Sequence, residues 1–331
     1  MSYGAQSKVG FARQASAGTA VTDPTSFHGF GFVSEDIGLE IEELISENLT
    51  GQFEEGATYQ GVNRINGTIE FEATPRNLGV ALAMVVNHSP VTVSSNNIRS
   101  RTFLPNTVDF SSTLCKAPWT MYKQFTDATS GEHFYDMQFG QLEFTLAQGA
   151  LLRARATCIG GTRTATGIGS ADVRPVIADV GRLFPWSVSS ISYGGAAVGN
   201  FSEITVSLNE NIDSLYTING TLSPFKYTRT GFRQVTVNGT FFFTDRTFLN
   251  NFVSDTQARL LITCVNTRAA IESGYYNTFT IDVPQAKITA FKPGASGPGE
   301  VSVNITLRGV ADPNSGYAIQ FTQVSTWQAG Y

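Results

Sequence analysis

Two runs of alternating apolar and polar residues within 37–73 constrain the fold more than any other feature of the sequence. The first run alternates apolar side chains with glutamates: Leu39, Glu40, Ile41 and Glu42. The second run, residues 65–73, alternates in the same way and carries Glu70 and Glu72 on its polar side. A period of two is typical of strands with one buried and one wet face. We therefore predict a long antiparallel hairpin with a large loop and an acidic wet face.

A short helix is predicted directly after this hairpin. Thr74 and Pro75 precede apolar residues at helical spacing, namely Leu78, Leu82 and Val85. Threonine is a favourable N-cap, and proline suits the first position of a helix because the N–H it lacks would be unpaired there. The pattern predicts a helix that begins at Pro75 with Thr74 as its cap.

The same unit occurs again in the second half of the chain. Asn66-Gly67-Thr68 returns as Asn238-Gly239-Thr240, and the alternating run at 204–209 corresponds to the run at 39–42. Asp245 is then expected to cap a second helix that includes Phe248, Leu249, Phe252 and Val253. Residues 140–161 likewise have a counterpart at 284–309. Four matches in the same order predict one β-rich unit used twice.

The predicted organisation has five parts. They are an N-terminal arm at 1–30, a first unit at 31–160 with an insertion at about 87–135, a linker at 161–186, a second unit at 187–316 and a C-terminal arm at 317–331. The linker follows from a glycine, threonine and serine run after Gly160-Gly161. The C-terminal arm is apolar enough to pack on a sheet edge, in the same subunit or in a neighbour.

Composition excludes some classes of function. The formal net charge of -5 argues against a sequence-independent nucleic-acid binder, which needs a basic surface. Only 15% of the residues are charged, which leaves room for subunit packing, although a monomeric β-sandwich with polar surfaces fits equally well. No signal peptide is expected, and the longest apolar run, 78–86, is far shorter than the ~20 residues that span a bilayer. Three cysteines without metal-ligand spacing predict free thiols.

Catalytic, metal and cofactor sites are not predicted. The three histidines have no acidic or histidine partner at helical spacing, and no hydrolase, zinc-protease or phosphate-loop motif is present. Glu42-Glu43 and Glu54-Glu55 are the only paired carboxylates, and neighbouring residues in a strand point to opposite faces. A solvated acidic surface is therefore preferred to a glycosidase site.

The order of these features resembles the major tail tube proteins of long-tailed bacteriophages. The resemblance rests on KVGFARQASAGTAV at 8–21, on FGFVSEDIGLEIE at 30–42 and on INGTIEFEATPRNLGVALAMV at 65–85. It is strongest over residues 8–86 and continues, through the repeat, over 187–316. The chain departs from the family pattern at Arg13-Gln14, where an acidic residue commonly precedes the Gly-Thr of the arm.

The resemblance implies a fold and a function. It implies a small β-sandwich or barrel with a long hairpin and a flanking helix in each unit, and a structural virion protein that self-assembles into stacked rings. The tube would carry the genome out of the head, would assemble in the bacterial cytoplasm, and would meet tape-measure and tail-terminator proteins. Fused two-domain members imply a trimeric, pseudo-sixfold ring, with a hexamer as the alternative. No membrane and no specific DNA binding are implied.

We predict that the wet faces of the hairpins line the channel. The predicted residues are Glu40, Glu42, Glu70, Glu72, Thr205, Ser207, Asn209, Asn238 and Thr240. An acidic lining would repel duplex DNA within a Debye length of ~8 Å and so prevent sticking. Alternatively these glutamates meet basic residues across subunit contacts, the candidates being Arg153, Arg155, Lys287 and Arg308.

A rival hypothesis is a two-domain adhesin or carbohydrate-binding module. It requires a cluster of exposed aromatic side chains, for which Trp119, Tyr122, Phe134 and Tyr135 are the candidates. The alternative is that these rings pack beneath a long loop. An enzyme is the third and least favoured reading, because the catalytic motifs are missing.

Overall fold

The structure is a computed structural model, and the chain is mainly β. The structure describes residues 7–48, 56–88, 92–93, 98–125, 131–164, 182–218, 220–244, 246–272, 274–294 and 300–326. Within those residues the α-helices are α1 (Pro75–Val85) and α2 (Thr247–Val253), and short 3-10 turns lie at Pro24–Ser26 and Trp186–Val188. None of the described helices is long and apolar enough to cross a bilayer.

Strands in the first half follow the predicted alternation. They are β1 (Lys8–Arg13), β2 (His28–Phe30), β3 (Ser34–Glu35), β4 (Gly38–Ile45), β5 (Thr58–Glu72), β6 (Asn87–His88), β7 (Thr92–Val93), β8 (Arg99–Leu104), β9 (Trp119–Gln124), β10 (Gly131–Ala147) and β11 (Arg153–Thr164). In β11, Ala154, Ala156 and Cys158 are buried while Arg153 and Arg155 are exposed.

Strands in the second half repeat this order. They are β12 (Ser189–Tyr193), β13 (Ala196–Ala197), β14 (Phe201–Asn209), β15 (Ile212–Leu215), β16 (Lys226–Arg229), β17 (Gln234–Phe242), β18 (Gln257–Glu272), β19 (Tyr275–Gly294), β20 (Ser302–Val310) and β21 (Gln320–Ser325). The strand pairings of the two halves correspond as well. The pairing of β5 with β11 is equivalent to that of β17 with β20. The pairing of β1 with β9 is equivalent to that of β12 with β18.

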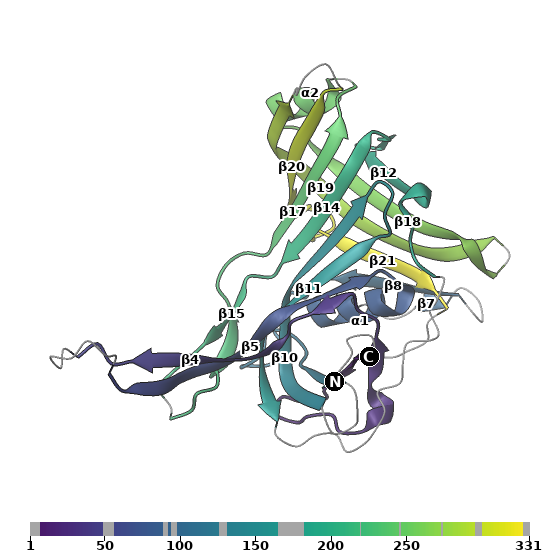
Figure 1. The fold of residues 1–331 in the computed structure, drawn as a ribbon. Helices are drawn as coiled ribbons and strands as arrows, with labels where there is room; N and C mark the ends of the chain where they lie inside the picture. Colours follow the sequence, from purple (N-terminus) through teal and green to yellow (C-terminus); the bar gives the residue numbers. More distant parts are fainter. Residues whose placement is uncertain are drawn as a thin grey trace.

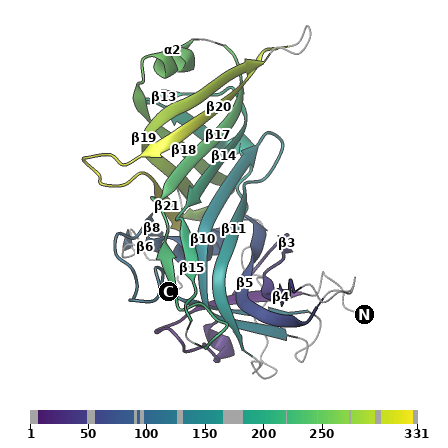
Figure 2. The same ribbon diagram turned by 90° about the vertical axis from the view of Figure 1, so that its left-hand side faces the viewer.

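All the main strands belong to one connected sheet (Figures 1 and 2). Its central order is β5, β11, β10, β14, β17, β20, β19, β18 and β12, with each neighbouring pair antiparallel. Strand β9 continues along the first part of β10, and β21 joins β19 to β8. The two halves are thus joined twice within the sheet, at β10–β14 and at β21–β8.

One large apolar core fills the space enclosed by this curved sheet, and two smaller buried clusters lie beside it. It contains residues of both halves, and Phe144 of β10 packs against Phe279 of β19 and Phe321 of β21 with ring centroids 5.3 and 5.5 Å apart. Burial of such large rings is a main source of stability, roughly 25 cal/mol for each Å² of apolar surface removed from water. The halves therefore stabilise each other.

Helix α1 confirms its predicted start. The backbone N–H of Asn77 donates to Thr74 Oγ1 over 3.2 Å, and Pro75 occupies the first turn. The helix is buried beneath β10 and β6, and Gln323 of β21 donates to the carbonyl of Pro75.

Helix α2 differs from the prediction. It begins at Thr247 with Arg246 at the N-cap position, and no side chain caps it. The expected cap, Asp245, lies outside the described residues. Phe248 is buried, whereas Phe252 is 38% exposed.

Other predicted segments have definite places in the sheet. Residues 8–13 of the expected N-terminal arm form β1 between β2 and β9, with Val9 and Phe11 buried. The expected insertion at 87–135 supplies β8 and β9, and the expected C-terminal arm supplies β21. Residues 165–181 of the expected linker are outside the described part of the chain. The boundaries of two tandem domains stay a prediction.

Candidate functional surface

Alternation along six neighbouring strands gives the sheet one apolar and one polar side. The apolar side faces the core, and the opposite side is called here the polar face. Its residues are Thr68, Glu70 and Glu72 of β5; Arg153, Arg155 and Thr157 of β11; Gln141, Glu143 and Thr145 of β10; Glu203, Thr205, Ser207 and Asn209 of β14; Thr236, Asn238 and Thr240 of β17; and Asn304, Thr306 and Arg308 of β20. The face runs without a break across the β10–β14 seam.

Cross-strand register sets the chemistry of this face. One row reads Glu70, Arg155, Glu143, Ser207, Thr236 and Arg308 in successive strands. The next row reads Glu72, Arg153, Thr145, Thr205, Asn238 and Thr306. Directly opposed side chains of this kind lie within interaction range. The first half of the face is therefore charged and the second half mostly neutral.

Arginines of β11 meet the predicted acidic residues within one chain. Arg153 Nη1 lies 3.1 Å from Glu70 Oε1, and Arg155 Nη2 donates to Thr68 Oγ1 over 3.2 Å. The alternative partners Arg153 and Arg155 are thus neighbours of the glutamates without any subunit contact. The Glu40 carboxylate accepts a hydrogen bond from Asn66 Nδ2 over 2.7 Å, which places Glu40 on the same side.

Asp36 adds a further acidic group at the edge of the polar face. The backbone N–H of Thr68 donates to Asp36 Oδ1 and lowers the pKa of that carboxyl, and the charge of Arg155 lowers it further. This carboxylate remains ionised at neutral pH.

The predicted neutral residues of β14 and β17 form hydrogen bonds with polar side chains of neighbouring strands, except Asn209, whose bond is local. Gln141 Nε2 donates to Ser207 Oγ, and the hydroxyls of Thr145 and Thr205 lie 3.4 Å apart. The Thr306 and Thr240 hydroxyls donate to the amide oxygens of Asn238 and Asn304, each over 3.0 Å. Asn209 accepts a hydrogen bond from the backbone of Asn211 through Oδ1. Glu42 lies apart, exposed on β4.

Two hairpins extend beyond the core and expose apolar side chains. Figure 1 shows β4–β5 and β15 projecting from the body of the molecule in the same direction. On the first hairpin Ile41, Leu44 and Tyr59 are 53%, 52% and 68% exposed. On the second hairpin Ile218 is almost fully exposed, as is Phe232 in the connection from β16 to β17. The predicted buried face of β4 is thus uncovered in the single chain, a feature that usually marks an interaction site.

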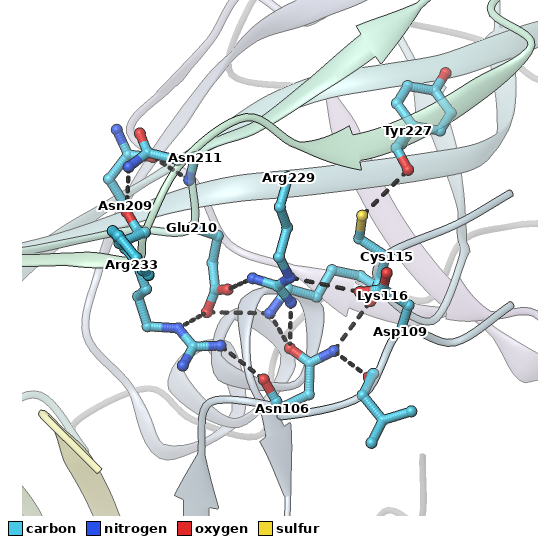
Figure 3. Close-up of polar contacts among 12 residues, drawn as sticks. Asn106, Asp109, Cys115, Lys116, Asn209, Glu210, Asn211, Tyr227, Arg229 and Arg233 are labelled. Atoms are coloured by element: carbon cyan, nitrogen blue, oxygen red, sulfur yellow. Dashed lines mark hydrogen bonds and ion pairs between the residues drawn. The ribbon is translucent and has the colours of Figure 1, made fainter. Parts of the chain in front are cut away.

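The second hairpin is fixed to the body by a buried carboxylate (Figure 3). Glu210 follows β14, is fully buried and is surrounded by three cations. Lys116 Nζ lies 3.1 Å from Glu210 Oε1, while Arg229 Nη1 and Arg233 Nε lie 2.5 and 2.9 Å from its two oxygens. Arg229 also contacts Asp109, so residues from β8–β9 and β16–β17 meet here. We call these five residues the Glu210 cluster.

Burial and ion pairing have opposite outcomes for the pKa values of Lys116 and Glu210 in this cluster. Desolvation lowers the pKa of Lys116 to about 8, even though Glu210 favours its charged form. Burial alone would raise the pKa of Glu210, but Lys116 and Arg233 outweigh it and the pKa is lowered. The carboxylate is therefore charged and fully paired. Sequence reasoning missed this cluster, because periodicity places Glu210 at a strand end and does not show that the end is buried.

The aromatic candidates of the adhesin hypothesis do not form an exposed cluster. Trp119, Tyr122 and Phe134 are buried, and Tyr135 is half-buried. The expectation that these rings are packed is therefore confirmed for Trp119, Tyr122 and Phe134, although they lie in strands β9 and β10 of the sheet. Cys115, Cys158 and Cys264 are buried free thiols, also as predicted. Among the described residues, no three His, Cys, Asp or Glu side chains are grouped so as to hold a metal ion.

The sequence of the chain matches a known protein family. A family model described as phage tail tube protein matches residues 4–309, which is nearly the whole chain. The chain belongs to the phage tail tube protein family. The resemblance noted in the sequence is therefore confirmed. No curated protein matches the chain.

Membership assigns the chain to the virion. A tail tube protein is a structural component of the bacteriophage tail, and the tube is built from many subunits. The mainly β architecture of this chain is consistent with that role.

Proposed function

We propose that this tail tube protein forms rings of three copies that stack into a tube, with the polar face lining a channel for duplex DNA. The observation that carries the proposal is the β10–β14 pairing. Within one chain it joins the two halves edge to edge and continues both the core side and the polar face of the sheet. The same junction, formed between chains, would close a ring.

Corresponding edges are available for that junction. In the described residues β4 pairs on one side only, with β5, whereas its counterpart β14 pairs with both β17 and β10. On β19 the pairing with β18 ends at Lys287, which leaves residues 288–294 unpaired on that side. An unpaired edge readily accepts another strand. We propose that β4 of one subunit pairs with the end of β19 of the next.

The repeat also gives the register of this junction. Gly67 pairs with Cys158 and Gly239 pairs with Ile305, which aligns the two halves. In that alignment Gln141 of β10 corresponds to Lys292 of β19, because they pair with Thr157 and Asn304. Asn209, which pairs with Gln141, corresponds in the same way to Glu42 of β4, because Asn209 pairs with β17 at the position where Glu42 lies along β5. The proposed junction therefore sets Glu42 opposite Lys292, two exposed side chains of opposite charge.

Three chains would supply six hairpins, hence a pseudo-sixfold ring, with six chains as the alternative. Head-to-tail contacts of this kind close a ring, while a second set of contacts produces stacking. The exposed tip of the second hairpin, near Ile218, suits the stacking contacts. We further propose self-assembly in the bacterial cytoplasm, contacts with tape-measure and tail-terminator proteins, passage of the genome at ejection, and no catalytic activity.

We also propose that the chain contains two tandem domains. The equivalent pairings of Gly67 with Cys158 and of Gly239 with Ile305 support this proposal.

A disulfide between the two edges tests the junction. The variant Glu42→Cys/Lys292→Cys should form a cross-link between chains under mild oxidation, and a closed three-chain species should appear on a denaturing gel. Glu47→Cys/Lys292→Cys is the matched control, because Glu47 lies beyond β4 and should cross-link poorly. Equal cross-linking of both variants, or none in assembled material, would contradict the proposed register.

A further inference from the structure

The arginines of β11 are the main basic groups in the first half of the polar face. Arg153 is 51% exposed and its ion-pair partner Glu70 is 34% exposed. Arg155 stands directly opposite Glu70 on β5 and Glu143 on β10, while Arg153 stands opposite Glu72. Each of these arginines therefore has a carboxylate next to it on at least one neighbouring strand.

We propose that Glu70, with Glu72 and Glu143, neutralises Arg153 and Arg155 so that the channel wall does not bind the DNA backbone. This inference rests on the proposed channel function of the same face. It assigns the glutamates a local task, which is to occupy guanidinium groups, in place of a general repulsion of DNA.

The physical reason lies in how duplex DNA binds proteins. The duplex carries one charge for about every 1.7 Å of its axis, and each arginine or lysine that contacts a phosphate releases a counterion and strengthens binding. An arginine repeated around a ring and along a tube would give many such contacts at once. A guanidinium already held by a carboxylate has fewer free donors and little net charge to offer a phosphate.

The rest of the polar face provides internal comparisons. Glu203 of β14 stands opposite Ala147 and Thr240, and no ion pair joins it among the described residues. Removing its charge therefore changes the net charge of the face without releasing an arginine. Arg308 of β20 stands opposite Thr236 and Lys287, so it represents a basic residue without an adjacent carboxylate in its row.

DNA binding by matched variants tests the inference. Glu70→Gln and Glu203→Gln each remove one negative charge from the same face. Duplex DNA is added to the soluble chain and to assembled material at about 50 mM salt, and retention is measured by gel shift and by co-sedimentation. Glu70→Gln should bind about threefold or more tightly than both the wild type and Glu203→Gln, which follows if a surface ion pair is worth up to ~1 kcal/mol.

Two further variants make the result specific. Glu70→Gln/Arg153→Gln should return binding to the wild-type level, because the released arginine is removed. Arg308→Gln should weaken whatever binding the wild type shows. Equal binding by Glu70→Gln and Glu203→Gln would overturn the inference and would point to net charge alone. Failure of the wild type to form rings or tubes would instead contradict the proposed function, and the soluble-chain measurement would still decide the role of Glu70.

Discussion

Lys116 Nζ lies 3.1 Å from Glu210 Oε1, and the side chains are only 4% and 0% exposed. The pair joins the segment between β8 and β9 to the end of β14, two regions far apart in sequence. Together with Arg229 and Arg233, it fixes the base of the second projecting hairpin. The hairpin is therefore oriented before any neighbour binds it.

Glu210→Gln should destabilise the chain strongly. The substitution leaves three cations around a neutral amide, and breaking a buried ion pair from one side costs about 3–5 kcal/mol. Asp109→Asn is the matched control, because Asp109 is 53% exposed and contacts only Arg229 in the cluster, so its loss should cost less than about 1 kcal/mol. Urea denaturation measures both. Similar losses for the two variants would show that burial of Glu210 does not matter.

The stability of the chain should rise with pH above about 8 through Lys116. Burial lowers the pKa of this amine to about 8 from 10.5, so between these values the unfolded state binds more protons than the folded state. Stability rises with pH wherever that holds. Urea midpoints measured from pH 7.5 to 10.5 for the wild type and Lys116→Met should show a smaller rise in the variant. Parallel curves would exclude Lys116 as the source.

Thr74→Ala should cost about 1 kcal/mol through loss of the N-cap of α1. The hydroxyl accepts the backbone N–H of Asn77 at the start of a fully packed helix, so that N–H would be left buried without a partner. Thr74→Ser keeps the hydroxyl and should stay close to the wild type. Thermal denaturation distinguishes the two, and equal melting temperatures for Ala and Ser would mean that the cap contributes nothing.

Gly67→Ala should be more damaging than Gly239→Ala, although both glycines occupy the same Asn-Gly-Thr motif. Gly67 has φ +124°, and a Cβ there would lie 2.6 Å from the carbonyl oxygen of Asp36, which is backbone. Such a conformation costs an L-residue about 2–3 kcal/mol. At Gly239 the Cβ would meet the ring of Phe201 at 2.5 Å, and a half-buried ring can move, for about 1 kcal/mol. Denaturant midpoints of the two variants decide the order.

Local patterns predicted the strands and the first helix well. The alternation at 65–73 gave the correct buried residues of β5, such as Ile69 and Phe71, because a strand with one side on a core must alternate. Thr74 and Pro75 likewise determine where α1 begins, since the cap depends only on neighbours in sequence. The correspondence between Gly67 and Gly239 is equally visible in sequence and structure.

Contacts between distant segments were not predictable in this way. The alternation of β4 suggested a buried side, but Ile41 is half exposed, and no other strand in the described part of the chain pairs with β4 besides β5. The prediction of an acidic wet face was also incomplete, because it did not include the arginines. The pairing of β11 with β5 brings Arg153 beside Glu70, and the sequence of either strand does not show this. Glu210 sits after a strand like any surface residue, and its burial depends on a loop that begins about a hundred positions earlier.

Electron microscopy of the purified chain after concentration tests whether rings close through the β4 edge. We expect hollow tubes with a regular axial repeat, threefold rings in top view, and loss of the tubes in a variant with Ile41→Asp on the exposed apolar side of β4. Tyr275→Asp is the control for an added charge at an exposed aromatic position, because Tyr275 is 50% exposed and begins β19, at the opposite end of that strand from residues 288–294. Rings without a central channel, or tubes that persist unchanged with Ile41→Asp, would contradict ring closure through the β4 edge.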